Sequence, residues 1–212
     1  MKTSGQFDPS VHLIDDDASI RGALQRLLSL EGFRVRTYAS ATDFLMEKEG
    51  GLRGCLLMDI RMPDGLSGLE LHKVLQRERV SLPVIFLTGH GSISMCAQAM
   101  RDGAFDFLTK PIVKNSLLAA VSAALGKERD DWEEEMRLLE LEARGRSLTP
   151  CESKVFQRVA RGEANKQIAD AVGCSERTVK AHRANVMTKM GADSLAALVR
   201  FCQDLEKRGW VS

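Results

Sequence analysis

The sequence predicts an α/β domain built on a five-stranded, doubly wound parallel sheet, followed by a small all-α domain. Two observations carry this prediction. Over residues 10–125, five short apolar runs alternate with five stretches whose apolar residues recur at helical spacing. From residue 148 onward the strand pattern ceases and only helical spacing remains. Because successive βα units place the carboxyl ends of parallel strands at one edge, we expect function at that edge.

The expected elements of the first domain follow one another in regular order. The five runs that we expect to form strands are residues 11–14, 33–37, 55–58, 84–87 and 105–108. Helices are expected between and after them, at residues 19–30, 41–47, 69–76, 93–100 and 116–125.

Residues 126–146 are expected to form a charged helical linker between the two domains. Apolar side chains recur there at roughly helical spacing, at Trp132, Met136, Leu139 and Leu141. A solvated tether and a helix that pairs with a partner chain fit this segment about equally well. Residues 147–212 make up the second domain, and the sequence Thr-Pro-Cys-Glu at residues 149–152 is typical of a capped helix start.

Composition narrows the class of protein. The chain has 44% hydrophobic and 28% charged residues, as ordinary globular domains do. No apolar run approaches the roughly 18 residues of a membrane span, and residues 1–9 lack the apolar core of a signal peptide, so we expect a cytoplasmic protein. Five scattered cysteines without a C-x-x-C pair disfavour a disulfide framework and a zinc site. Residues 148–212 hold 11 basic and 7 acidic residues, which permits nucleic-acid binding without establishing it.

Charged and hydroxyl side chains stand at four predicted strand ends. Asp15 and Asp16 end the first strand, Asp59 the third, Thr88 the fourth and Lys110 the fifth. Three carboxylates brought together repel one another, so they either share protons or bind a hard cation such as Mg²⁺. The lysine adds a compact positive charge for a phosphoryl group, and the threonine adds a hydroxyl donor. The plainer interpretation is a set of unrelated loop charges.

The motifs at these strand ends resemble the receiver domain of two-component response regulators, which has a flavodoxin-like fold. They are I-D-D-D at 14–17, D-I-R-M-P at 59–63, T-G-H-G at 88–91 and F-L-T-K-P at 107–111. The set spans nearly all of residues 10–125, and four motifs in this order form a specific signal. One departure stands beside the site, because four residues separate Pro63 from Gly68 where the family usually has three.

The resemblance implies a role for each site residue. Asp59 would be the phosphoacceptor, phosphorylated by a sensor histidine kinase. Mg²⁺ would be bound by Asp15, Asp16, Asp59 and the backbone carbonyl of Arg61, and Lys110 would contact the phosphoryl group. Such a domain promotes its own phosphorylation and dephosphorylation and is not otherwise an enzyme.

The resemblance also implies a switch that ends in a homodimer. Thr88 would move toward the phosphoryl oxygens and Phe107 would rotate inward, which remodels the face of residues 94–101, 105–108 and 112–117. Apart from the resemblance, Phe107 fits simple core packing on a strand equally well. His90 is expected to be a loop residue and not a base or metal ligand.

Residues 165–191 have the pattern of a helix-turn-helix: a short helix, a turn at Gly173 and a longer second helix. Ser175 is a suitable cap for the second helix. An apolar stripe of Val179, Val186 and Met190 is expected to face inward. Lys180 and Arg183, with Arg177 near the helix start, are then expected to face outward, where they can reach phosphates or guanine edges.

The second domain resembles the LuxR-type DNA-binding domain of the NarL/FixJ class of regulators, in its FixJ-like branch. The motifs are L-T-P-C-E at 148–152, N-K-Q-I-A at 165–169, S-E-R-T-V-K-A-H at 175–182 and K-M-G-A-D-S at 189–194. By this resemblance the DNA-contacting residues would be Asn165, Lys166, Ser175, Arg177, Thr178, Lys180, Ala181 and Arg183. The same resemblance assigns His182 to the domain's own structure and phosphate contacts, and Val186, Leu195 and Val199 to internal packing or a dimer contact.

We therefore predict a cytoplasmic transcription regulator that binds double-stranded DNA and dimerises when Asp59 is phosphorylated. Two other classes remain open at this point. One is a small-molecule phosphotransferase or phosphatase; in such an enzyme, Asp59→Asn would abolish turnover of a diffusible substrate. The other is a regulator that acts through protein partners, which would lack salt-dependent binding to random duplex DNA.

Overall fold

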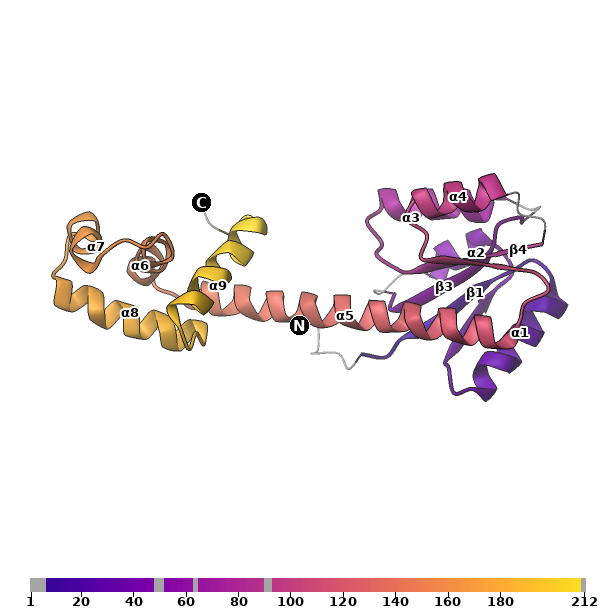
Figure 1. Cartoon of the computed structure of the whole chain (residues 1–212), viewed down its shortest axis with the longest axis horizontal. Coiled ribbons are helices and arrows are strands. Elements are labelled where there is room, and N and C mark those ends of the chain that lie inside the picture. Colours follow the sequence, from indigo (N-terminus) through magenta and orange to yellow (C-terminus); the bar gives the residue numbers. More distant parts are fainter. Residues whose placement is uncertain (1–6, 48–51, 63–64, 90–92, 211–212) are drawn as a thin grey trace. The chain divides into compact units, whose positions relative to one another are not determined.

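Strands and helices alternate through the first part of the chain (Figure 1). The computed structural model describes residues 7–47, 52–62, 65–89 and 93–210, with the backbone alone at 93–96. The elements are β1 (Ser10–Ile14), α1 (Ala18–Leu30), β2 (Val35–Tyr38), α2 (Ala41–Glu47), β3 (Gly54–Asp59), α3 (Gly68–Arg77), β4 (Val84–Thr88), α4 (Ile93–Arg101), β5 (Asp106–Thr109) and α5 (Lys114–Arg146).

All five expected strands form one parallel sheet in the order β2-β1-β3-β4-β5. The register pairs Ile14 of β1 with Met58 of β3, and Asp59 of β3 with Leu87 of β4. The residues that follow β1, β3 and β4 therefore emerge side by side at one edge of the sheet, as the doubly wound topology requires.

Two apolar clusters cover the two faces of this sheet. On one face, Leu24 and Leu28 of α1 and Leu117 and Val121 of α5 pack against inward residues of the central strands. On the other face, α2, α3 and α4 contribute buried residues such as Phe44, Leu71 and Ala99 to a second cluster. The central strands are buried on both sides, which explains why β3 and β4 are nearly continuous apolar runs in the sequence, while β1 also buries His12 beside the Tyr38 hydroxyl.

Several predicted element boundaries were wrong by one or more residues, and three of them have a clear structural reason or consequence. The second strand begins at Val35 and not at residue 33, because the Phe33 amide donates to the Leu28 carbonyl in the turn that closes α1, where Gly32 has a φ of 88°. The fifth strand is shifted by one residue, to Asp106–Thr109. The last expected helix does not stop at residue 125, because α5 continues to Arg146 and takes in the charged segment.

The part of α5 that belongs to residues 1–132 is held by specific contacts beyond residue 125. Glu128 is 1% exposed, and its carboxylate accepts a hydrogen bond from Arg53 at 3.3 Å. Burial raises the pKa of Glu128, although Arg53 acts in the opposite direction. Trp132 contacts the ring of Phe7 with a centroid separation of 5.4 Å, and Arg129 lies over the same ring. Trp132, one of the apolar residues that recur along the linker, is therefore packed against another part of the first unit and is not simply a residue of a solvated tether.

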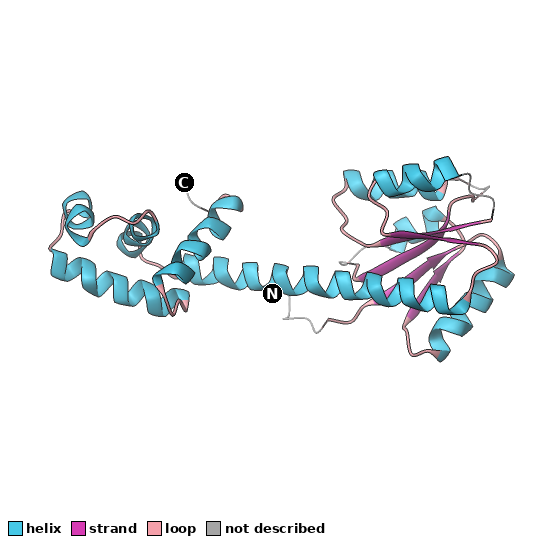
Figure 2. Ribbon diagram, viewed as in Figure 1, coloured by secondary structure: helices cyan, strands magenta, loops and turns pink. Residues whose placement is uncertain are grey.

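Residues 133–212 form a second compact unit, distinct from residues 1–132, and the described part of this unit contains helices without strands (Figure 2). The last turns of α5 pack here with α6 (Pro150–Ala160), α7 (Asn165–Val172), α8 (Glu176–Met190) and α9 (Leu195–Lys207). Gly145 of α5 lies so close to Trp210 that an added Cβ would meet the indole at 2.8 Å. This end of α5 therefore belongs to the second core, which also contains Leu141 and Phe156.

The predicted start of α6 is confirmed in detail. Thr149 caps the helix, Pro150 stands in its first turn, and the Glu152 carboxylate accepts a hydrogen bond from the Thr149 amide at 2.9 Å. Glu152 also pairs with Lys189 of α8 at 2.6 Å, which links α6 to α8. None of the helices described is both long and apolar enough to cross a membrane.

Candidate metal centre and nucleic-acid interface

Three carboxylates converge at the edge of the sheet where β1 and β3 end. Asp15, Asp16 and Asp59 each offer an oxygen, and these three oxygens lie within 4.8 Å of one another. Asp15 is fully buried and Asp59 is 9% exposed, whereas Asp16 is exposed to solvent. The sequence placed all three at this edge, and the structure brings them together as predicted.

Lys110 extends from the end of β5 into this cluster. Its ammonium group lies 2.7 Å from Asp15 Oδ2 and 2.6 Å from Asp59 Oδ2. Burial raises the pKa of Asp15, and the hydrogen bond and charge of Lys110 only partly offset that effect. Burial by itself would lower the pKa of Lys110, but its two carboxylate partners outweigh burial and raise it. The lysine therefore stays charged and neutralises part of the acidic cluster.

Local backbone contacts fix the directions of the acidic side chains. The Asp17 amide donates to Asp15 Oδ1 at 3.0 Å, and Asp17 itself caps α1 through the amides of Ser19 and Ile20. The Arg61 amide donates to Asp59 Oδ1 at 2.9 Å. Because both oxygens of Asp59 have partners, its side chain has a defined rotation in the cluster.

Thr88 and Phe107, the two residues expected to form a switch, differ in exposure. Thr88 ends β4, is 4% exposed, and its carbonyl accepts the Lys110 amide at 2.7 Å. Phe107 on β5 is 38% exposed, so the alternative of simple core packing is wrong. An aromatic ring this exposed on a strand has room to change its rotamer.

Some sequence predictions lie outside the described residues. They are His90, Pro63 and Asp64, the last of which begins the four-residue stretch that is one residue longer than usual. This stretch ends at Ser67, which caps α3 through a capping box with Glu70. At Gly68 an added Cβ would meet the Asp59 carbonyl oxygen at 2.3 Å, so the start of α3 packs directly on the backbone of the acidic strand end.

The donor set fits a divalent cation. All three ligand atoms are carboxylate oxygens, which suit hard ions such as Mg²⁺ and do not select softer ones. Two of the carboxylates come from buried backbone positions and the third is open to solvent, so an ion held here would keep access to water and to an incoming ligand.

The second unit contains the predicted helix-turn-helix in α7 and α8. The turn residue Gly173 has a φ of 75°, a left-handed conformation that glycine adopts at low cost. Ser175 caps α8 by accepting the Thr178 amide at 3.1 Å. Of the expected inward stripe, Val179 is 0% and Val186 1% exposed, and Met190 is also buried. The opposite face of α8 is consequently turned to solvent.

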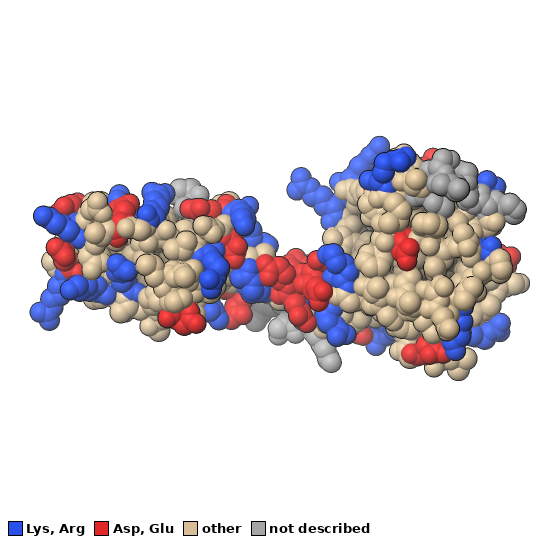
Figure 3. Space-filling model, in the orientation of Figure 1, with Lys and Arg blue, Asp and Glu red and all other residues tan. Residues whose placement is uncertain are grey.

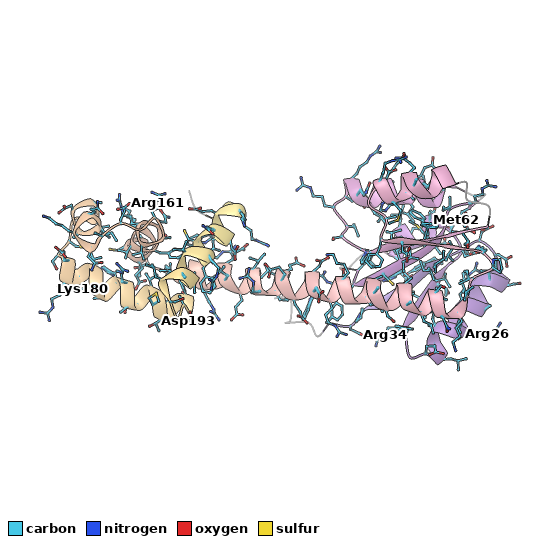
Figure 4. All side chains as sticks on the ribbon, viewed as in Figure 1. Arg26, Arg34, Met62, Arg161, Lys180 and Asp193 are labelled. Atoms are coloured by element: carbon cyan, nitrogen blue, oxygen red, sulfur yellow. The ribbon has the colours of Figure 1, made fainter. Side chains whose placement is uncertain are left out.

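The expected contact residues differ in how freely they can reach a ligand. Exposed side chains are those of Lys166, Arg177, Thr178, Lys180 and Ala181. Lys180 projects from α8 away from the domain (Figure 4). Arg183 is half-buried and donates to the Asn165 side chain of α7 at 2.7 Å, a pairing that the sequence did not reveal.

His182 faces the interior of the helical domain. Its Nε2 lies 3.3 Å from the Cys151 sulfur of α6, and its Nδ1 is buried without a partner among the described residues. This orientation agrees with a role in the domain's own structure, as expected from the sequence.

Comparison with known proteins settles the family. Residues 11–122 match the response regulator receiver domain, and residues 146–202 match bacterial regulatory proteins of the luxR family. The transcriptional regulatory protein FixJ of Azorhizobium caulinodans is 44% identical over 190 residues, which cover 90% of this chain and 90% of FixJ. This chain is a response regulator of the NarL/FixJ class. Nodulation protein W of Bradyrhizobium diazoefficiens is also 40% identical to this regulator, over 92% of the chain and 86% of that protein.

Solved structures agree with this assignment over both domains. The response regulator StyR matches this regulator with a TM-score of 0.81 at 40% identity, over 92% of this chain and 98% of StyR. Full-length FixJ from B. japonicum matches with a TM-score of 0.58 at 37% identity, over 95% of this chain and 99% of FixJ. The regulator thus combines a receiver with a LuxR-type DNA-binding domain, and its family consists of transcription regulators and not of classical enzymes.

The sequence missed one residue that takes part in the acidic edge. Arg21 of α1 donates to the backbone carbonyls of Asp15 and Asp16, at 2.6 and 3.3 Å. A signal was present, because a residue four positions after the Asp17 cap stands one helical turn above the loop. Nothing in the sequence, however, distinguishes an arginine that reaches back to a loop from one that points to solvent.

Proposed function

We propose that Asp59 is the phosphoacceptor of this regulator and that a Mg²⁺ ion is held by Asp15, Asp16, Asp59 and the carbonyl of Arg61. The observation that carries the proposal is the convergence of three carboxylates, two of which pair with Lys110, whose ammonium lies 2.6 Å from Asp59. When bound, the ion supplies positive charge that stabilises the oxygens of a phosphoryl group in transfer.

The chain's own groups define the transfer step. An Asp59 carboxylate oxygen attacks the phosphorus of a phosphohistidine on a sensor kinase, and the phosphorus–nitrogen bond breaks as the acyl phosphate forms. The histidine nitrogen leaves with the bonding electron pair and takes a proton from solvent. Lys110 moves its hydrogen bond from Asp59 to a phosphoryl oxygen, which stabilises the product charge. Hydrolysis of the acyl phosphate at the same site resets the receiver.

Phosphorylation is proposed to change the face that contains Phe107. In this proposal Thr88, which ends β4, donates its hydroxyl to the phosphoryl group, and Phe107 rotates inward as space opens behind it. The face of residues 94–101, 105–108 and 112–117 includes the exposed apolar residues Met100 and Val113. Much of the receiver surface turned toward the viewer in Figure 3 carries few charged side chains. Such a face suits association with a second copy of the chain.

The α8 helix is proposed to enter the major groove of DNA. Lys180 and Arg177 are exposed and reach phosphates or base edges. Asn165 and Lys166, at the start of α7, contact the sugar-phosphate backbone of the DNA. Ser175, Thr178 and Ala181 complete the contact surface. Arg183 is restrained by Asn165, so we assign it to the backbone contacts rather than to base readout. Two copies bind half-sites about one helical turn apart, roughly 10 base pairs.

The proposal is tested by sequencing the DNA fragments that the full chain retains, with and without a beryllofluoride phosphoryl mimic. We expect one palindromic site to be enriched only with the mimic, and Asp59→Asn to abolish that enrichment. Lys180→Ala should weaken binding, whereas Arg161→Ala, which removes an exposed charge at the end of α6, should have little effect (Figure 4). Enrichment that ignores the mimic would contradict phosphorylation control.

A further inference from the structure

The carbonyls of Asp15 and Asp16, in the loop that carries the acidic pair, both accept hydrogen bonds from one guanidinium group of α1. Arg21 Nη1 donates to the Asp15 carbonyl at 2.6 Å and to the Asp16 carbonyl at 3.3 Å. The Arg21 amide also donates to the Asp17 carbonyl at 2.9 Å, as part of the first turn of α1. Side chain and main chain of one residue therefore bind three consecutive carbonyls of the loop.

The two aspartates of this loop depend on it to different degrees. The Asp15 carboxylate is fixed independently, since it is fully buried and bonded to Lys110 and to the Asp17 amide. The Asp16 carboxylate is exposed, and no hydrogen bond from it to another described residue is present. Its direction is consequently set by the conformation of its own backbone, and the Asp16 carbonyl is held by Arg21.

We propose that Arg21 is a positioning residue for the divalent cation: it holds the backbone of the loop so that the Asp16 carboxylate faces Asp15 and Asp59. This inference rests on the proposed metal centre. The charge of Arg21 and its positioning of the loop should affect cation affinity in opposite directions. Because the guanidinium is positive, removing it should strengthen cation binding if only its charge matters. If it positions Asp16, removing it should weaken binding, because groups that orient metal ligands typically contribute 10-fold to 100-fold in affinity.

The test measures cation binding to the full chain directly, with Mn²⁺ as the probe and electron paramagnetic resonance of the free ion as the readout. We expect Arg21→Met to weaken Mn²⁺ binding roughly 10-fold. The matched control is Arg26→Met, which removes an exposed arginine from the same helix and should leave the affinity within about twofold (Figure 4). If Arg21→Met does not fold, Arg21→Gln is measured against the same expectation, because glutamine is too short to reach the loop.

A second readout separates positioning from general damage. With a small-molecule phosphodonor, Arg21→Met should raise the Mg²⁺ concentration needed for half-maximal phosphorylation, while the rate at saturating Mg²⁺ stays within about threefold of wild type. Unchanged or tighter Mn²⁺ binding in the Arg21 variants overturns the inference. If the wild-type chain itself binds no Mn²⁺, the proposed metal centre fails, which is a distinct result.

Discussion

Lys110→Ala is predicted to destabilise the receiver in a way that depends on both pH and metal. The substitution leaves Asp15, which is fully buried, and Asp59, which is 9% exposed, without their shared cation. Two short charge-assisted hydrogen bonds are lost, and removing one partner of a buried ion pair typically costs 3–5 kcal/mol. Because the lysine side chain keeps 17% exposure, we expect the lower end, about 3 kcal/mol.

The pH dependence of this loss has a definite sign. Burial already raises the folded-state pKa of Asp15, so its contribution to stability is greatest below its ordinary pKa and falls as pH rises through the folded value. Without Lys110 the pKa rises further and that fall becomes larger. The loss should therefore be greater near about pH 7 than near about pH 5, and saturating Mg²⁺ should recover much of it.

The assay is urea unfolding of the full chain in a Trp210→Phe background, so that Trp132 alone reports on the first unit. Lys114→Ala is the matched control, because Lys114 forms an exposed pair with Glu31 that should contribute about 0.5 kcal/mol or less. A Lys110→Ala chain as stable as this control in the absence of metal, at neutral pH, would refute the electrostatic account of the cluster.

Three other perturbations test separate parts of the structure. Glu152→Gln should cost about 2 kcal/mol in the second unit at neutral pH. The hydrogen bond from Lys189 lowers the pKa of Glu152 to about 2, so the stabilising contribution of Glu152 in wild type falls as the pH drops from about 4.5 through that pKa. Glu152→Gln should remove this acid dependence. Urea unfolding followed by Trp210 fluorescence measures both the stability loss and its pH dependence. Phe7→Ala should shift Trp132 emission to the red and speed amide exchange at the preceding turn of α5, and unchanged spectra would argue against this packing. If Asp59 is phosphorylated as proposed, Gly68→Ala should slow that reaction severalfold, because the added Cβ would meet the Asp59 carbonyl oxygen at 2.3 Å; wild-type rates would show that α3 can shift.

The acidic site could be predicted from the sequence because its residues stand at strand ends. A buried parallel strand is a continuous apolar run, so Asp15 and Asp59 are recognisable as the first polar residues after such runs. Parallel topology alone then places them at one edge. The same argument found Lys110, although the fifth strand itself was shifted by one residue.

The contacts that orient the site could not be predicted in this way. Arg21 binds backbone carbonyls, and Arg183 binds Asn165 across the helix-turn-helix, so each depends on distances between elements that carry no periodic signal. The sequence predicted that residues 126–146 are helical, but not that they continue the preceding helix without a break. The contact of buried Glu128 with Arg53 of a distant loop likewise carries no periodic signal.

The central claim is tested most directly by mass spectrometry of the full chain after incubation with a phosphodonor and Mg²⁺. We predict one added phosphoryl group, which depends on the divalent ion. Peptide mapping, carried out after the acyl phosphate has been chemically reduced, should locate this group on Asp59. A phosphoryl group on another residue, or none on a chain that binds the ion, would contradict it.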